Sequence, residues 1–175
     1  TAAIQDGAVT AAKLARQPGN LLSENQASVE ASTSGLAVWN ACTIATSAAW
    51  AASGSNSLLV TATAGNPAAG TVEGTSGVPV TAGQTYTATA TVKAGTATGR
   101  AADLYLAWYT SGGTFISYAG GGGSTGNTLS ATAITLTRTA VAPATAAYAA
   151  VGVGSSTAVA GETFYADALG LWRGA

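Results

Sequence analysis

Short stretches in which apolar and polar residues alternate make up most of this chain. In the clearest of them, TYTATATVKA (85–94), Tyr86, Val92 and the two alanines between them alternate with threonines. A period of two is typical of a strand that buries one face and leaves the other in water. This stretch therefore predicts a half-buried strand with a threonine face.

Similar stretches, separated by turns rich in Gly, Ser, Asn and Pro, follow one another along most of the chain. They are ASVEAS (27–32), AVWNACTIAT (37–46), SLLVTAT (57–63), GTVEGTS (70–76), ADLYLAWY (102–109), FISYA (115–119), TAITLTRTAV (132–141), AAYAAVGV (146–153) and ETFYADALGLW (162–172). No convincing helical period occurs beyond residue 20. Nine or ten short strands predict an all-β fold, a jelly-roll β-sandwich.

The first nineteen residues differ from the rest. Within 1–19, TAAKLARQ can form about two helical turns, too short to be stable alone. Ile4, Val9 and Leu14 fit no single helix or strand face, so we expect them to dock on the domain or on copies of themselves. The predicted organisation is a helical or extended oligomerisation segment at 1–19 and a sandwich domain at 20–175.

Composition excludes several classes of protein. Charged residues are 7% of the chain and the net charge is −1, without the basic stripe that nucleic-acid binding needs. The hydrophobic 47% is mostly alanine, and no run reaches the roughly 18 apolar residues of a membrane span, so we expect a soluble protein without membrane insertion. Histidine is absent and Cys42 is the single cysteine, which excludes Cys/His zinc sites, Ser-His-Asp triads and internal disulfides.

Seven motifs stand in the order and spacing of one known family. They are NLLSENQASVE (20–30), GLAVW (35–39), SGSNSLLVT (53–61), VTAGQTYTATATVKA (80–94), WYTSGGTFIS (108–117), APATAAYA (142–149) and GETFYADALGL (161–171). Over 20–173 the chain resembles the calcium-containing jelly-roll carbohydrate-binding modules of bacterial xylanases and cellulases. It departs from them in two places. In SVE (28–30) a valine stands where an aromatic residue usually precedes Glu. In GLAVW (35–39) three residues separate the Gly and the Trp that are adjacent in the family, which leaves the role of Trp39 open.

The N-terminal segment resembles a different family. IQDGAVTAAKLA (4–15) is similar to a repeat of bacteriophage tail fibres and minor tail proteins, in which copies from three chains wind together. The resemblance implies a homotrimer that continues from the rest of a tail protein upstream.

The carbohydrate-binding resemblance implies a calcium site. In such modules the ion joins the first strand to the last through a glutamate, an aspartate and backbone carbonyls, and Glu30 and Asp167 stand at the matching positions. A Ca²⁺ ion would explain a carboxylate inside an apolar strand, which is costly when uncompensated. The alternative is a hydrogen-bonded Asp167 at a strand end without a metal.

Aromatic residues are the candidate sugar site, because sugar rings stack on Tyr and Trp. Tyr105 and Tyr109 share a strand face with Asp103, opposite a set formed by Leu104, Leu106 and Trp108. If that set fills the core, the two tyrosines lie on an outer sheet surface. Packing remains the alternative for both.

Other residues are expected around these tyrosines. Asp103 or Arg100 would bond sugar hydroxyls, and Trp50 and Tyr118 would flank the rings from loops. For Trp39, Trp108, Tyr86 and Tyr165 we expect ordinary packing.

An enzyme is not expected, because no spacing pairs the remaining carboxylates, Glu73, Asp103 and Glu162, in the way that glycoside hydrolysis requires. The favoured interpretation is a non-catalytic glycan-binding domain of a phage tail or receptor-binding protein, located in the virion and recognising host cell-surface glycan. Two alternatives stay open: a purely structural tail trimer domain, or a carbohydrate-binding module of a secreted polysaccharide-degrading enzyme.

Overall fold

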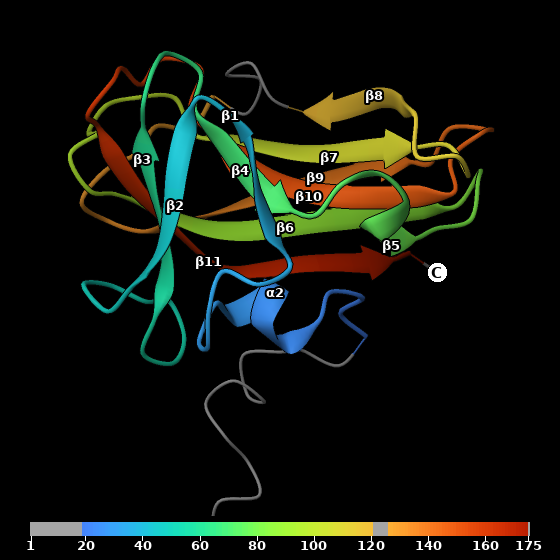
Figure 1. Cartoon of the computed structure of the whole chain (residues 1–175), viewed down its shortest axis with the longest axis horizontal. Helices are drawn as coiled ribbons and strands as arrows, with labels where there is room; N and C mark the ends of the chain where they lie inside the picture. Colours follow the sequence, from blue (N-terminus) through green and yellow to red (C-terminus); the bar gives the residue numbers. More distant parts are fainter. Residues whose placement is uncertain (1–18, 121–125, 175) are drawn as a thin grey trace, which may run out of the picture.

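Two antiparallel β-sheets pack face to face in the computed structural model, which describes residues 19–120 and 126–174 (Figure 1). The six-stranded sheet has the order β1 (Leu36–Asn40), β4 (Ala68–Thr71), β10 (Tyr148–Gly154), β7 (Asp103–Tyr109) and β8 (Phe115–Gly120), and β5 (Val78–Pro79) also pairs with β10. The five-stranded sheet has the order β2 (Cys42–Ser47), β3 (Ser57–Ala62), β11 (Thr163–Arg173), β6 (Thr85–Ala94) and β9 (Ile134–Val141). The prediction of an all-β jelly-roll sandwich is confirmed.

The core lies between the sheets and is built from the inward half of each alternating strand. On β6 buried and half-buried residues alternate without interruption, as the sequence predicted. Tyr86 and Trp108, from facing sheets, meet edge to face with ring centroids 5.9 Å apart, and the Tyr86 hydroxyl accepts the Thr81 N–H at 2.8 Å. Cys42 is buried, as expected of a small apolar residue.

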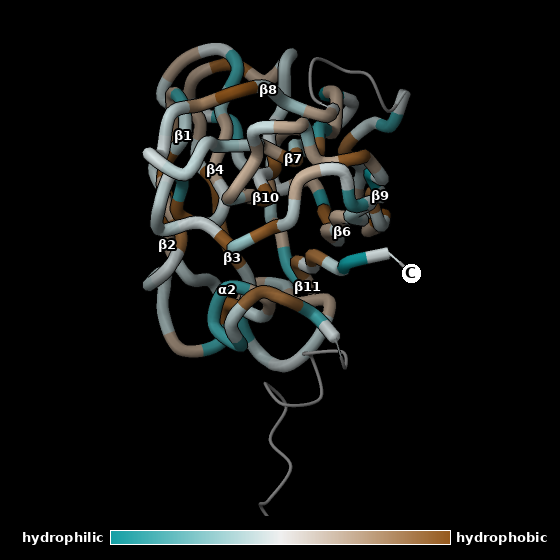
Figure 2. Tube along the Cα trace, turned by 90° about the vertical axis from the view of Figure 1, so that its right-hand side faces the viewer, coloured by the Kyte–Doolittle hydropathy of each residue, from teal (hydrophilic) through white to brown (hydrophobic). Residues whose placement is uncertain are grey.

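A one-turn helix, α2 (Glu24–Ser28), contradicts the expectation of no helix beyond residue 20. The strand predicted at 27–32 is not formed, because Ala27 and Ser28 end this helix and Val29 is its left-handed C-cap. Ser23 and Gln26 form a capping box: the Ser23 hydroxyl accepts the Gln26 N–H, and the Gln26 side chain accepts the Ser23 N–H. So short a helix is marginal alone. Figures 1 and 2 show it lying against β11, whose packing stabilises it.

The stretch predicted as one strand at 37–46 is two strands in two different sheets. Ala41 has a φ of 44°, a left-handed conformation that turns the chain from β1 in one sheet into β2 in the other. The strand predicted at 70–76 also divides: its start belongs to β4, and a 3-10 turn, η1 (Gly74–Ser76), follows Glu73. Alternation alone cannot detect such crossings, because both strands keep a period of two.

The chain enters the sandwich at Asn20, a buried residue beside β11. Its side-chain amide donates to the Leu169 carbonyl at 3.0 Å, and its side-chain oxygen accepts the Leu171 N–H at 3.0 Å. Leu21 adds a backbone bond to Leu171 at 2.8 Å. The sequence-predicted segment at 1–19 lies, apart from Gly19, outside the described residues. Among the described helices, none is long and apolar enough to cross a membrane.

Candidate functional site

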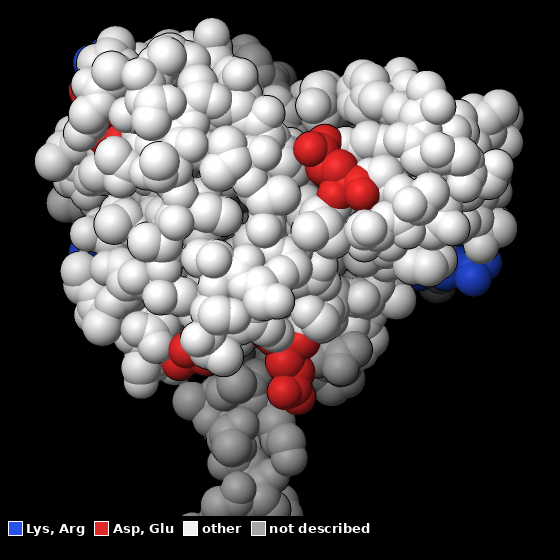
Figure 3. Space-filling model, viewed as in Figure 1, with Lys and Arg blue, Asp and Glu red and all other residues white. Residues whose placement is uncertain are grey.

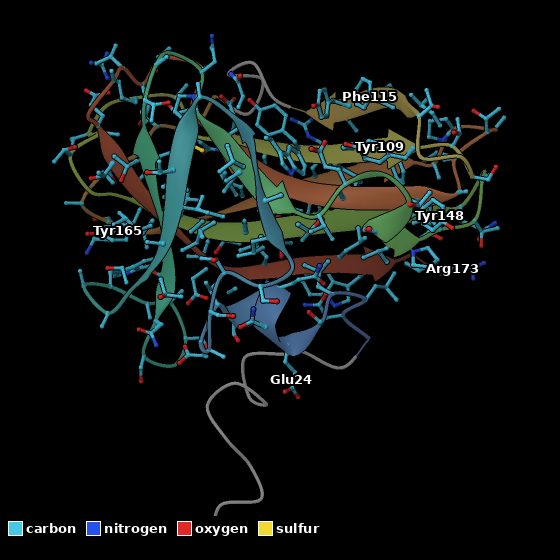
Figure 4. All side chains as sticks on the ribbon, in the orientation of Figure 1. Glu24, Tyr109, Phe115, Tyr148, Tyr165 and Arg173 are labelled. Carbon is cyan, nitrogen blue, oxygen red and sulfur yellow. The ribbon has the colours of Figure 1, made fainter. Side chains whose placement is uncertain are left out.

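The outer face of the six-stranded sheet carries a group of aromatic side chains. We call it the aromatic face; its members are Trp39 on β1, Tyr105 and Tyr109 on β7, Phe115 and Tyr118 on β8, and Tyr148 on β10. The predicted division of β7 is confirmed, since Leu104, Leu106 and Trp108 belong to the main core and Tyr109 to a separate outer cluster. Figure 4 shows Phe115, Tyr109 and Tyr148 one below the other on three neighbouring strands.

Trp39 lies flat on the sheet because two glycines leave room beneath it. A Cβ on Gly152 would lie 2.3 to 2.7 Å from three atoms of the Trp39 ring, and one on Gly70 would lie 2.8 Å from the same ring. The indole N–H donates to the Thr71 carbonyl at 3.0 Å, which fixes the ring orientation. We expected Trp39 to be ordinary packing; the structure instead places it on the aromatic face, partly exposed.

A hollow of about 360 Å³ opens beside this ring. The Trp39 hollow, as we call it, is lined by Trp39, Asn40, Asn66, Ala68, Tyr105 and Tyr118. Trp39 and Tyr118 are close to parallel, with centroids 6.3 Å apart and an interplanar angle of 26°, and Tyr105 meets Tyr118 edge to face at 5.5 Å. The hollow thus combines apolar ring surfaces with two side-chain amides, as small-molecule sites commonly do.

Glu73 and Tyr109 form the polar centre of the aromatic face. The Tyr109 hydroxyl donates to the Glu73 carboxylate, and burial, followed by this bond and the carboxylate charge, raises the pKa of Tyr109. The pKa of Tyr118 is raised as well, by burial first and then by the charge of Glu73. Both phenols therefore stay neutral hydrogen-bonding groups at physiological pH.

Charge is otherwise sparse on the surface around this region. In Figure 3, which shows one face of the molecule, acidic atoms form one spot near the middle and otherwise lie at the margins, as the basic atoms do. A weakly charged surface suits a ligand bound through ring stacking and neutral hydrogen bonds rather than through ion pairs.

The structure brings together only some of the residues predicted for the sugar site. Tyr105 and Tyr118 line the Trp39 hollow, and Tyr118 lies on β8, the strand predicted at 115–119, rather than flanking the site from a loop. Tyr109 lies on the same face but is only 4% exposed, so it supports the other rings more than it offers a surface. Asp103 is 1% exposed and accepts the Ser156 N–H at 2.7 Å, which ties the end of β7 to a neighbouring loop.

Two predicted residues lie elsewhere. The Arg100 guanidinium forms a bidentate ion pair with Glu162, with N–O distances of 2.8 to 3.0 Å. The guanidinium that was predicted to bond sugar hydroxyls is therefore engaged by Glu162. Trp50 packs on Tyr165 of β11, with centroids 6.2 Å apart, and carries Lys93 of β6 over its ring at 5.9 Å. It therefore belongs to the five-stranded sheet and cannot flank Tyr105.

The sequence pattern did not predict four residues of this region, Trp39, Asn40, Asn66 and Glu73. A usable signal for the first exists in β10, where Gly152 interrupts an otherwise regular strand, since glycine within a strand often marks a close approach. Asn40 ends β1, Asn66 lies between β3 and β4, and Glu73 lies between β4 and η1, and strand alternation does not show that these positions come together.

The predicted metal ligands, Glu30 and Asp167, both hold the loop between β2 and β3. One oxygen of Asp167 accepts the N–H groups of Ala52 and Ser53 at 2.8 and 2.9 Å, and Glu30 accepts those of Ser55 and Asn56 at 2.9 and 3.1 Å. Asp167 is fully buried, and this burial raises its pKa to about 6; its backbone donors offset part of the effect, and the charge of Glu30 adds to it.

These residues fit a hard cation. The other Asp167 oxygen, Oδ1, is buried without a hydrogen-bond partner, and a buried orphan acceptor is costly. Within the described ranges no three His, Cys, Asp or Glu side chains converge, so a Ca²⁺ ion here would need backbone carbonyls and water as its further oxygen ligands.

Comparison with known proteins shows the fold. A scan against protein-family models and a search of curated sequences give no match. Among solved structures, the chain is similar to the CBM22-1 xylan-binding domain of Paenibacillus barcinonensis Xyn10C, with a TM-score of 0.62, 15% identity and coverage of 88% of this chain and 94% of that one. The chain is also similar to the C-terminal family 22 carbohydrate-binding module of Clostridium thermocellum Xyn10B. The TM-score is 0.60 and the identity 19%, with coverage of 89% of this chain and 93% of that one.

A phage protein shares the fold as well. The enzymatically active domain of bacteriophage CBA120 tailspike protein 4 matches with a TM-score of 0.61 and 12% identity, over 89% of this chain and 21% of that one. At such identities the likeness concerns the fold alone. The chain therefore has the jelly-roll fold of carbohydrate-binding modules.

Proposed function

We propose that this chain is a non-catalytic glycan-binding domain of a phage tail or receptor-binding protein, and that the Trp39 hollow holds the sugar. The observation that carries the proposal is the seat of Trp39 on Gly152 and Gly70. A flat, partly exposed indole on a rigid sheet is a platform on which the C–H face of a pyranose can stack.

The rest of the hollow supplies orientation. The amides of Asn40 and Asn66 and the hydroxyls of Tyr105 and Tyr118 are neutral groups that can bond sugar hydroxyls. A single site of this kind binds weakly, because each such bond replaces one to water. We expect a dissociation constant of about 0.1 to 1 mM for one site.

Catalysis is not part of the proposal. Glycoside hydrolysis uses two carboxylates on either side of the scissile bond. The described residues that line the Trp39 hollow include no Asp or Glu. Glu73, nearby on the aromatic face, is engaged by Tyr109.

The assignment to a phage tail is supported by the resemblance of IQDGAVTAAKLA (4–15) to tail-fibre repeats, and a tailspike domain with this fold gives a precedent. A parallel homotrimer would present three copies of the site to a host cell-surface glycan. Simultaneous binding raises overall avidity by about 10² or more without new contacts, which compensates for weak single sites.

We also propose that Glu30 and Asp167 hold a structural Ca²⁺ ion. The support is the buried, unpartnered Oδ1 of Asp167 and the influence of the Glu30 charge on the same carboxyl group. When bound, the ion neutralises the two carboxylates. The residues themselves fix the β2–β3 loop through Ala52, Ser53, Ser55 and Asn56.

A glycan array with the full chain tests the proposal. We expect binding to bacterial cell-wall or capsular glycans, and loss of the signal in Tyr118→Ala, whose ring is 49% exposed. Val159→Ala, at the same 49% exposure and outside both the aromatic face and the Trp39 hollow, is the matched control and should still bind. Binding confined to xylan and related plant polysaccharides would favour a module of a secreted enzyme, and a folded chain that binds no glycan would favour a structural tail domain.

A further inference from the structure

A second hollow, of about 500 Å³, lies on the opposite side of the sandwich, on the outer face of the five-stranded sheet. We call it the threonine hollow; it is lined by Asn20, Thr89, Thr91, Thr135, Ala168, Leu169 and Trp172. Its volume falls within the roughly 300 to 1,000 Å³ of small-molecule sites. None of the residues assigned to the aromatic face takes part in it.

Trp172 forms one wall in the way that Trp39 does on the other sheet. Its neighbour Leu171 is fully buried in the core, so by alternation the Trp172 side chain is on the outer face. A Cβ on Gly170 would lie 1.8 to 2.6 Å from three atoms of the Trp172 ring. The indole therefore lies flat over Gly170, held against the sheet with its other face turned outward.

The floor is a row of threonine hydroxyls. On β6 the alanines beside Thr89 and Thr91 face the core, so these threonines face outward, and Thr91 pairs with Thr135 of β9. The hydroxyls of Thr91 and Thr135 are 3.1 Å apart and bond to each other. A hydroxyl donates one bond and accepts two, so each member of the pair can also bond a ligand.

The walls are rigid and uncharged. The Asn20 side chain is fixed by Leu22, Leu169 and Leu171, whose backbone groups it bonds at 3.0 to 3.1 Å. Ala168 and Leu169 belong to the irregularity between Asp167 and Gly170, where β11 departs from the register of β6. In the part of the chain that the structure describes, no charged side chain lines the hollow. The ligand that such a site recognises is neutral, carries many hydroxyls and has an apolar face.

We propose that the threonine hollow is a second saccharide-binding site, with Trp172 as the stacking platform and Thr91 and Thr135 as hydroxyl partners. The two sites lie on outward faces of opposite sheets, so one glycan chain cannot occupy both along a single groove. A domain with both sites would bridge two glycan chains. The inference does not depend on the aromatic face, because its residues and its sheet are different.

NMR titration of the ¹⁵N-labelled full chain tests it, with xylotetraose, mannotetraose, maltotetraose and chitotetraose as probes up to about 20 mM, an upper limit suited to millimolar sites. We expect at least one of them to shift the Trp172 indole N–H together with the amides of Thr89, Thr91 and Thr135. In T91V/T135V, which keeps the shape and removes two hydroxyls, the midpoint of these shifts should rise about tenfold.

The matched control is T87V/T139V. Thr87 and Thr139 form the equivalent hydroxyl pair, 2.9 Å apart on the same two strands, outside the hollow. This variant should leave the midpoint unchanged. The inference is overturned if none of the four probes moves the Trp172 indole signal, or if T91V/T135V binds like T87V/T139V.

A competing occupant is the chain itself, because Gly19 lies beside Trp172 and residues 1–18 precede it. Nuclear Overhauser contacts between the Trp172 indole and residues 1–18 that persist at saturating probe would show that this segment fills the hollow. That result would also overturn the proposal of a saccharide site.

Discussion

Tyr109 and Tyr118 lie on one face of the sheet, yet truncation of the two side chains should affect the stability of the fold very differently. Tyr109 is 4% exposed and bonded to Glu73, whereas Tyr118 is 49% exposed. Truncation of a large buried side chain typically costs about 3 kcal/mol or more, and truncation of an exposed ring costs little. Tyr105 and Tyr109 were predicted to lie together on the outer surface of the sheet; Tyr109 is on that face but is almost fully buried.

We therefore predict that Tyr109→Ala lowers the free energy of unfolding by about 3 kcal/mol, because it opens a cavity and leaves the Glu73 carboxylate without its donor. Tyr118→Ala should change it by less than about 0.5 kcal/mol while it weakens glycan binding. Urea unfolding and glycan titration of the two variants measure both effects. Equal stability losses would contradict the difference in burial between the two rings.

Asp167 should make stability depend on pH. Its pKa is raised from 3.8 in the unfolded reference to about 6 in the fold, so between these values the folded state binds the extra proton. We predict that, in the presence of a chelator, the contribution of Asp167 to the free energy of unfolding is greatest below pH 4. This contribution should fall by about 3 kcal/mol as the pH rises through 6. Asp167→Asn should remove this component.

Calcium should reverse that trend, because the ion binds the carboxylate form. When the Ca²⁺ concentration is about a hundred times the dissociation constant, an ion that binds only the folded state raises the free energy of unfolding by about 2.7 kcal/mol. The difference in melting temperature between calcium and chelator should be large at pH 7.5, small at pH 5 and nearly absent in Asp167→Asn. A wild type whose melting is indifferent to chelator at pH 7.5 would leave Asp167 as a hydrogen-bonded acid without a metal.

At the scale of elements, β10 and β1 together create the Trp39 platform. The atoms that a Cβ on Gly152 would meet first all belong to the Trp39 ring, and the residue has no left-handed φ that would strain an alanine. Gly152→Ala should therefore tilt the ring off the sheet while β10 itself remains intact.

We predict that Gly152→Ala weakens glycan binding about tenfold or more and shifts the Trp39 indole resonance, since the stacking surface loses its orientation. Gly65→Ala, at a position with no atom within 4 Å of the added methyl group, is the control. Calorimetric titration and one NMR spectrum of each variant suffice. Unchanged binding in Gly152→Ala would remove Trp39 from the site.

The sequence predicted the position of those strands in which apolar and polar residues alternate regularly. β6, β7, β9, β10 and β11 stand where the pattern placed them, because each keeps one face in a single continuous core. The one-turn helix and the crossing at Ala41 were missed, since both depend on tertiary contacts. For the same reason the candidate site was half predicted: the β7 tyrosines follow from parity, but Trp39 joins them only because β1 lies in the six-stranded sheet while β2, predicted as part of the same strand, lies in the other.

At the scale of the whole molecule, the proposed trimer would set how many sites act together. Ile4, Val9 and Leu14 have no common face within one chain, and a threefold axis would give them shared burial. We predict that light scattering at about 50 µM reports three chains for the full sequence and a weaker assembly after deletion of residues 1–18. A monomer at that concentration would contradict the trimer and weaken the assignment to a phage tail.

The hydrogen bonds that join Asn20 to β11 have a mechanical consequence. Tension that arrives along the chain from residues 1–18 reaches the fold at Asn20, which is bonded to Leu169 and Leu171 of β11, the middle strand of the five-stranded sheet. Load applied there spreads into β3 and β6 on either side before any strand can separate, whereas a load on an edge strand would peel it away one bond at a time. A domain anchored in this way can stay folded while a glycan held on its far sheet is pulled.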